Sequence, residues 1–286
     1  MSTESKIKFG PAGNSDSFYA QGLSGTENTA TWLKDRNLDS FEYSFGRGIN
    51  MGDAKAVQIR ETFKSNEIEI SFHAPYYINF CNENAEEILK SCQYIIDSVK
   101  MCLKIGGRRV VFHTGAIQKD DRAKACSRTF RNLEILIKML DEQNLKDIYI
   151  CPETMGKINQ MGTLEEVIEI CKMDGRFIPC IDFGHLNARE KGSLKTVKDF
   201  DCVIEKMLKE IPQKAKIFHA HFSKIQYGEQ GEIKHLTFED NFYGPDPELL
   251  IQSFKNFDVA PYVICESKGT QAEDAMFLKS LYFKKV

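Results

Sequence analysis

The chain has 286 residues, of which 42% are hydrophobic and 28% are charged, and its formal net charge is −3. This composition is ordinary for a globular protein with a sizeable core, and the charge argues against a strongly basic protein that coats nucleic acid non-specifically. It does not exclude an enzyme that meets phosphates through bound cations, because metal ions supply positive charge that a residue count misses.

Short apolar segments alternate with longer segments of helical periodicity along the whole chain. The apolar segments, each predicted to be a strand, are residues 7–10, 40–45, 69–73, 109–113, 147–153, 177–185, 216–222 and 262–266. The helices predicted to follow them are residues 26–36, 53–65, 84–105, 119–143, 163–173, 194–210, 247–257 and 272–282.

Strict strand–helix alternation predicts parallel strands joined by right-handed crossovers. Strands that are apolar on both faces fit a sheet that is covered by helices outside and packed inside. An open doubly wound sheet is the alternative, but no glycine-rich phosphate loop follows the first strand, and eight even repeats favour closure. We therefore expect an α/β protein with a (β/α)8 TIM-barrel fold, formed by residues 1–286 as a single domain.

Polar residues follow most of the predicted strands, at the end where the working face of such a barrel lies. Five of the six histidines occur at strand ends and the sixth, His235, lies in the loop after the seventh strand. The potential ligands at strand ends are His73, His113, Glu153, Asp182, His185, His219, His221 and Glu266.

A single histidine or carboxylate at a strand end is more often a hydrogen-bonded structural residue than a ligand. Here the strand ends converge on one mouth, where imidazoles and carboxylates packed together without a cation would suffer repulsion and desolvation. Mixed imidazole and carboxylate donors suit Zn²⁺ best, with Mn²⁺ or Fe²⁺ as alternatives. The number of donors exceeds what one ion takes, so we expect two or three ions.

Two pairs of neighbouring donors need an assignment. Asp182 and His185 are three residues apart across a Gly turn, so we expect them to serve different ions. His219 and His221 share one strand face because of the two-residue repeat. We favour His219 as the ligand and His221 as a deeper residue of the barrel.

The nine cysteines contain no C-x-x-C pair, so neither a disulfide framework nor a zinc ribbon is expected. The N-terminal residues have no apolar segment typical of a signal peptide, and no run of about 18 apolar residues occurs. We expect a cytoplasmic monomer with no membrane contact.

The strand-end motifs resemble those of the endonuclease IV family, within the xylose isomerase-like barrels. The similarity holds in order from about residue 69 to 268. It is carried by the motifs His73-Ala74-Pro75-Tyr76-Tyr77-Ile78-Asn79, His113-Thr114-Gly115, Glu153-Thr154-Met155-Gly156, Asp182-Phe183-Gly184-His185, His219 through Ser223-Lys224, and Glu266.

The resemblance implies three metal sites. Their ligands would be His73, His113 and Glu153 at the first; Glu153, Asp182, His219 and Glu266 at the second; and His185 and His235 with one carboxylate at the third. The family takes that carboxylate from an Asp-x-His motif, but Ile233 stands two residues before His235 here. Glu232 is the nearest substitute, and a solvated loop charge is an equally good interpretation of it.

The function implied is hydrolysis of damaged double-stranded DNA on the 5′ side of an abasic site, which is a DNA-repair reaction. Glu153 and Glu266 would orient the metal cluster, and Lys224 would offset charge on the phosphate. The resemblance places Tyr76 and Asn79 at the DNA. Arg47, in a loop less basic than the family's, would also contact it. An aromatic such as Tyr76 at a barrel rim is as often simple packing.

Two other functions are compatible with the same residues. A sugar isomerase or epimerase also uses Glu, Asp and His at strand ends, usually around one ion, so fold alone does not separate the two activities. A metal-storage module is the third alternative. Metal stoichiometry discriminates, since about three ions per chain indicate phosphodiester cleavage and about one indicates isomerisation.

Overall fold

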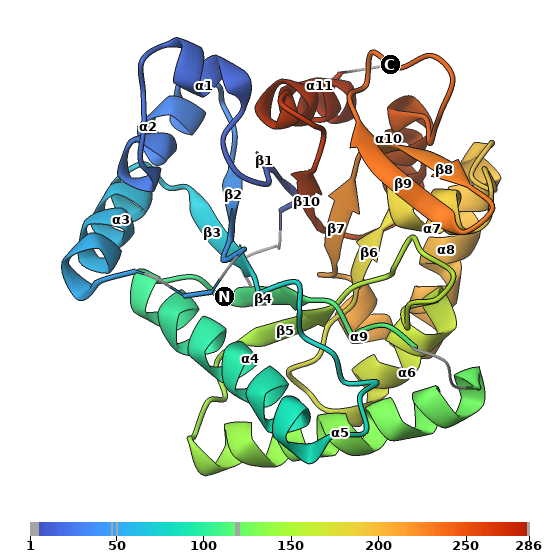
Figure 1. Ribbon diagram of the computed structural model, residues 1–286. Coiled ribbons are helices and arrows are strands. Elements are labelled where there is room, and N and C mark those ends of the chain that lie inside the picture. The colour runs from blue at the N-terminus through green and yellow to red at the C-terminus, as the bar shows by residue number, and fades with distance from the viewer. Residues whose placement is uncertain (1–5, 47, 50, 118–120, 285–286) are drawn as a thin grey trace.

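Eight parallel strands form a closed ring in the computed structural model, which describes residues 6–46, 48–49, 51–117 and 121–284 (Figure 1). The strands of the ring are β1 (Lys8–Pro11), β2 (Ser40–Ser44), β3 (Glu69–His73), β4 (Arg109–Phe112), β5 (Tyr149–Pro152), β6 (Cys180–Asp182), β7 (His219–Phe222) and β10 (Tyr262–Cys265). They form two sheets, β1-β10-β7-β6 and β2-β3-β4-β5. Parallel bridges from Ala12 to Glu42 and from Glu153 to Cys180 join the sheets. The predicted TIM barrel is confirmed.

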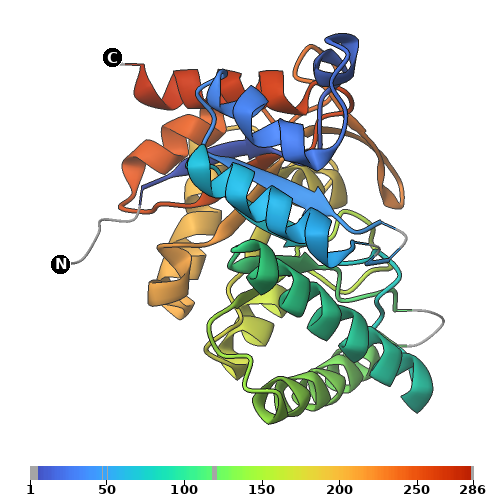
Figure 2. The ribbon, with the colours of Figure 1, turned by 90° about the vertical axis from the view of Figure 1, so that its left-hand side faces the viewer.

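Helices surround the ring on its outer side, as Figures 1 and 2 show. The longer ones are α3 (Asp53–Ser65), α4 (Ala85–Ile105), α5 (Arg122–Glu142), α6 (Leu164–Met173), α8 (Val197–Glu210), α10 (Pro247–Asn256) and α11 (Gln271–Phe283). The shorter ones are α1 (Asp16–Ala20), η1 (Thr26–Asn28), α2 (Thr29–Lys34), α7 (Phe183–Arg189) and α9 (Pro212–Ala215). The longer helices lie where the sequence pattern predicts them.

Local sequence signals set several helix ends. The side chain of Asn84 caps α4 by accepting from the backbone N–H groups of Glu86 and Glu87. Thr163 and Glu166 form a capping box at the start of α6, so both ends of that short motif satisfy otherwise free N–H groups. Gly106 ends α4 with a left-handed φ of 97°, a conformation that glycine adopts without a steric penalty.

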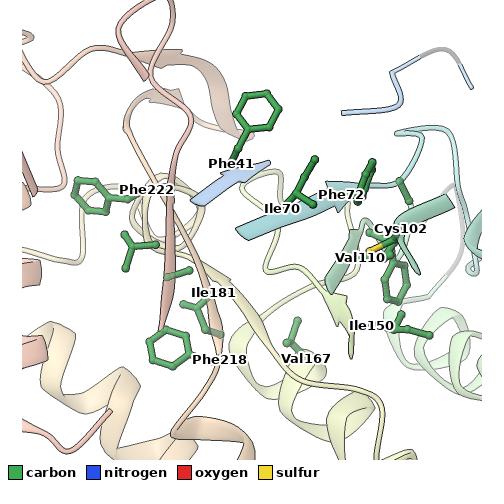
Figure 3. Close-up of a cluster of buried hydrophobic side chains, with 14 of the residues drawn as sticks. Phe41, Ile70, Phe72, Cys102, Val110, Ile150, Val167, Ile181, Phe218 and Phe222 are labelled. Carbon is green, nitrogen blue, oxygen red and sulfur yellow. The ribbon is translucent and has the colours of Figure 1, made fainter. Parts of the chain in front are cut away.

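The strand residues alternate between two environments. Outward-facing side chains pack against the helices, and Figure 3 shows Phe41, Ile70, Phe72, Val110 and Ile150 in this layer beside residues such as Cys102 of α4 and Val167 of α6. Inward-facing side chains form a second, smaller apolar cluster of Val111, Cys151, Ile178 and Cys180 inside the ring. This alternation follows from the two-residue strand repeat, and it leaves the polar inward residues directed at the barrel axis.

Two local features differ from the prediction. Strand β6 ends at Asp182, and His185 belongs to α7, because the Asp182 side chain caps that helix through a 2.6 Å hydrogen bond from the His185 N–H. The loop after β7 contains an unpredicted antiparallel hairpin of β8 (Lys224–Gly228) and β9 (Gly231–Leu236), which lies beside α7 (Figure 1). Both features belong to the part of the barrel that carries the candidate site.

No helix in the described ranges is both long enough and apolar enough to cross a membrane. The nine cysteines all lie within those ranges, and each is a free thiol.

Candidate metal centre

Three adjoining groups of potential ligands lie at the carboxyl ends of the barrel strands. Within each group, one donor atom from each residue lies within 4.8 Å of the others. The groups are His73, His113 and Glu153, termed group 1; Glu153, Asp182, His221 and Glu266, termed group 2; and His185, Glu232 and His235, termed group 3. Residues far apart in the sequence therefore converge as the strand-end motifs predict.

Glu153 connects the groups, because its two oxygens face different histidines. Oε2 lies 3.2 Å from Nε2 of His73 and 3.0 Å from Nε2 of His113. Oε1 lies 3.2 Å from Nδ1 of His185 and 3.2 Å from Nδ1 of His221. The carboxylate is fully buried and belongs to two of the groups, so it would contribute donor atoms to both if cations were bound.

The two carboxylate oxygens of Asp182 have different surroundings. Oδ1 accepts the capping hydrogen bond from the backbone of α7. Oδ2 is buried and has no aligned hydrogen-bond donor among the described residues, although Nδ1 of His185 lies 3.3 Å away. A buried carboxylate oxygen without a partner is costly, and a cation among the group 2 residues would satisfy it.

The hydrogen bonds of two histidines direct a free ring nitrogen into the site. Nδ1 of His73 lies 2.8 Å from the carbonyl of Ala74, and Nδ1 of His185 lies 2.9 Å from the carbonyl of Thr154. A carbonyl only accepts, so each Nδ1 carries the proton, and each Nε2 lone pair faces the neighbouring ligands. This arrangement is common for metal-binding imidazoles and fits divalent cations held by nitrogen and oxygen donors.

The charges of these side chains are strongly coupled when no cation is bound. Burial by itself would lower the pKa of His73, but the Glu153 carboxylate outweighs it and raises that pKa to about 9. Burial would raise the pKa of Glu153, but the histidines around it, first His221 and His113, hold it well below its usual range. Burial raises the pKa of Glu266 despite His221 and His235. Without a cation, protons held by these side chains therefore occupy positions at which a cation could bind.

Group 3 is built by the hairpin. Glu232 lies on β9, and its Oε2 is 3.3 Å from Nε2 of His185, while its Oε1 is 3.8 Å from Nε2 of His235. A Cβ at Gly156 would approach the Glu232 Cβ to 2.7 Å and the His185 ring to 2.9 Å, so glycine is required for this close packing. The structure thus brings Glu232 to the place expected for the third carboxylate.

Glu232→Gln tests whether group 3 holds its own ion. We expect loss of about one ion per chain with the others retained, because an amide is a far poorer ligand for a divalent cation than a carboxylate. Elemental analysis measures the ion count. Glu229→Gln, at an exposed position of the same hairpin, is the control. An unchanged ion count in Glu232→Gln would exclude group 3.

The structure places His221, and not the expected His219, among the group 2 residues. His221 pairs in register with Asp182, the last residue of β6, whereas His219 pairs with Cys180, two residues deeper. His221 therefore stands at the height of the other group 2 ligands. His219 is fully buried below it, with Nε2 3.0 Å from Oε2 of Glu42, and burial lowers the pKa of His219 to about 4. Cys180, His219 and His221 form a further buried cluster of potential donors.

Two other predicted residues, Lys224 and Asn79, belong to none of the ligand groups. The Lys224 ammonium donates to the backbone carbonyls of Phe238 (2.9 Å) and Asp240, in a separate depression, which does not support a catalytic role. Asn79 accepts a 2.9 Å hydrogen bond from the N–H of Cys81 and packs against Gly115. Arg47 lies outside the described residues.

A cavity of about 660 Å³ opens above the ligands. Its lining includes Tyr76, whose side chain is 64% exposed, and the exposed lysines Lys157, Lys234 and Lys268. An aromatic face and three cations around a mouth of carboxylates and imidazoles suit an anionic substrate with a planar or apolar portion.

Glu42 is a residue of this region that the sequence analysis did not identify. Glu42 lies in the middle of β2 with 1% exposure, between Phe41 and Tyr43. A charged residue within an apolar strand is itself a signal, since an acidic side chain is rarely buried unless it is paired. The sequence identifies His221 as a potential ligand, but its level along the barrel axis depends on the register between β6 and β7.

Comparison with known proteins identifies the class to which this barrel and its polar mouth belong. The model of the xylose isomerase-like TIM barrel family matches residues 30–281, and the chain belongs to that family. The chain is 32% identical over 249 residues to the uncharacterized protein MJ0133 of Methanocaldococcus jannaschii, covering 86% of this chain and 88% of the relative. It is 24% identical over 209 residues to a probable endonuclease 4 of Sulfurihydrogenibium sp., covering 70% and 73%.

Solved structures with different activities share the fold. Endonuclease IV of Thermus thermophilus superposes with a TM-score of 0.70 at 15% identity, covering 96% of this chain and 97% of that one. A D-tagatose 3-epimerase-like protein superposes with a TM-score of 0.68 at 19% identity, covering 96% and 95%. At this level of identity the similarity establishes the fold alone, so the activity has to be argued from the site.

Proposed function

We propose that this protein is a metal-dependent phosphodiester hydrolase that cleaves DNA on the 5′ side of abasic sites, with Zn²⁺ as its preferred ion. The observation that carries the proposal is the sharing of Glu153 between groups 1 and 2, with group 3 adjoining them. Three adjoining groups of three or four donors suit a cluster of ions, whereas a single-ion enzyme needs only one such group.

The cations would supply Lewis acidity, which activates water and neutralises charge on the phosphate and on the leaving oxygen. The protein's own residues position the reactants. Glu153 and Asp182 hold the ligand set together from buried positions, and the rim lysines attract the DNA backbone. Exposed Tyr76 can stack beside the abasic nucleotide, which is easily displaced because it has no base to unstack.

The test combines elemental analysis of protein purified without added metal with a nicking assay. The substrates are a duplex with one abasic site and the same duplex with an intact base pair. Hydrolysis adds water to phosphorus and breaks the bond to the 3′ oxygen. The products are therefore an upstream 3′-hydroxyl, which a polymerase can extend, and a downstream 5′ phosphate on the abasic sugar. About three ions per chain with selective nicking supports the proposal.

A sugar isomerase or epimerase is the second candidate, because group 2 alone offers one histidine and three carboxylates around a single position. An isomerase or epimerase should contain about one ion per chain and should not nick the abasic duplex. Incubation with ketohexoses, followed by chromatographic separation of epimers, measures that activity directly. Epimer formation without nicking of the abasic duplex would replace the hydrolase proposal.

A further inference from the structure

Glu42, on β2, is a buried carboxylate that touches two histidines of β7 inside the barrel. Its Oε1 lies 3.0 Å from Nε2 of His221, and its Oε2 lies 3.0 Å from Nε2 of His219. The Ser71 hydroxyl donates a 2.9 Å hydrogen bond to Oε2. Glu42 belongs to none of the three ligand groups, yet it is as buried as Glu153.

The ring of His221 stands between this carboxylate and group 2. Its Nδ1 faces Oε1 of Glu153 at 3.2 Å and Oε2 of Glu266 at 3.6 Å, while its Nε2 faces Glu42. The two ring nitrogens therefore meet different partners. Only Nδ1 is directed at the residues that would share a cation with His221.

Hydrogen-bond requirements assign the proton of the neutral ring. Within the described residues, neither Oε1 of Glu42 nor Nε2 of His221 has an aligned hydrogen-bond partner, although the two atoms are 3.0 Å apart. Buried polar groups are rarely left unpaired, and these two are complementary once Nε2 carries a hydrogen. A neutral imidazole has one N–H, so a proton on Nε2 leaves the Nδ1 lone pair free.

We propose that Glu42 is a positioning residue that accepts the Nε2–H of His221 and thereby directs the Nδ1 lone pair at the cation of group 2. The inference rests on the metal centre of the proposed function and deepens it. A carboxylate behind a ligand histidine fixes its tautomer and orientation and makes the coordinating nitrogen more basic. Oε2 accepts a hydrogen bond from Ser71 and lies 3.0 Å from Nε2 of His219, whereas Oε1 faces His221.

The test compares Glu42→Gln with Glu134→Gln. Glu42→Gln keeps the size of the side chain but removes its charge, so the affinity for one of the bound zinc ions should fall by about 10- to 100-fold, the usual loss for such a partner. Glu134→Gln makes the same chemical change on the exposed face of α5, away from the barrel mouth, so it should bind zinc like the wild type. Competition with a chelator measures affinity, and thermal unfolding measures the structural cost of each change.

A second measurement uses the unaltered protein, so the inference does not depend on the folding of a variant. Nitrogen NMR of the zinc-loaded wild type should show His221 with a proton on Nε2 and zinc on Nδ1. Zinc on Nε2 would overturn the inference. So would sulfur coordination by Cys180, seen as thiolate absorption after cadmium replaces zinc, because His221 would then serve the deeper cluster. Wild-type zinc affinity in Glu42→Gln would also overturn it.

These readouts separate the inference from the proposed activity. Zinc binding that depends on Glu42, in a protein that does not nick abasic DNA, would refute the proposed function and leave the role of Glu42 standing. Selective nicking of abasic DNA, together with a zinc affinity that does not depend on Glu42, would support the proposed function and refute the role of Glu42.

Discussion

Glu153→Gln should remove both metal binding and activity, with the largest effect of any single change in the site. Each Glu153 oxygen lies 3.0–3.2 Å from two histidines, so the carboxylate is shared by groups 1 and 2 and approaches His185, a member of group 3. An amide has the same shape but cannot bridge two cations, and its NH2 group would face imidazole nitrogens. We expect the ion count to fall to one or fewer per chain and cleavage to fall on the order of 1000-fold.

Elemental analysis after dialysis and the abasic-duplex nicking assay measure these losses. Glu134→Gln, on the exposed face of α5, is the matched control because it makes the same chemical change away from the barrel mouth. Breaking buried ion pairs without a cation costs roughly 3–5 kcal/mol, so the variant has to be checked for unfolding. Circular dichroism distinguishes unfolding from loss of metal alone. A Glu153→Gln protein with its full complement of ions and full activity would contradict the bridging role.

Metal-free protein should lose stability as the pH rises from 6.5 to 9. The folded-state pKa of His73 is about 9, above its ordinary value of 6.5, because Glu153 outweighs the opposing effect of burial. A group whose pKa is higher in the folded state than in the unfolded state makes its full contribution to stability at a pH below the unfolded-state pKa. That contribution disappears as the pH rises past the folded-state pKa. The full effect of this shift is roughly 3 kcal/mol. The raised pKa of His185 acts in the same direction, since nearby carboxylates, first Asp182, outweigh its burial.

Zinc binding should show the opposite trend over the same range. A cation takes the place of the proton on each ligand histidine, so zinc affinity rises with pH, about tenfold per unit for each proton displaced. Denaturant unfolding of metal-free protein at several pH values tests the first trend, and calorimetry in buffers of different ionisation enthalpy counts the released protons. His73→Asn should flatten the stability profile and release fewer protons. Rising stability of the metal-free wild type between pH 6.5 and 9 would contradict the assignment.

Much of this protein could be predicted from local sequence patterns. Apolar runs and helical periodicity gave the alternation of strands and helices, because each follows from repeats of two or 3.6 residues that neighbouring residues display. The same pattern identified the strand ends, and closure of parallel strands requires those ends to meet. His73, His113, Glu153, Asp182 and Glu266 do converge, since each stands at or directly after the end of a barrel strand.

The tertiary structure decided the features that depend on register and on contacts across the barrel. His219 and His221 share one face of β7, and only pairing with β6 places His221 level with Asp182. Glu232 reaches His185 because the hairpin folds over Gly156, and a register shift within that hairpin is not visible in a local pattern. Glu42 meets His221 through the barrel interior. These positions are set by pairing between distant segments, which no repeat within one segment encodes.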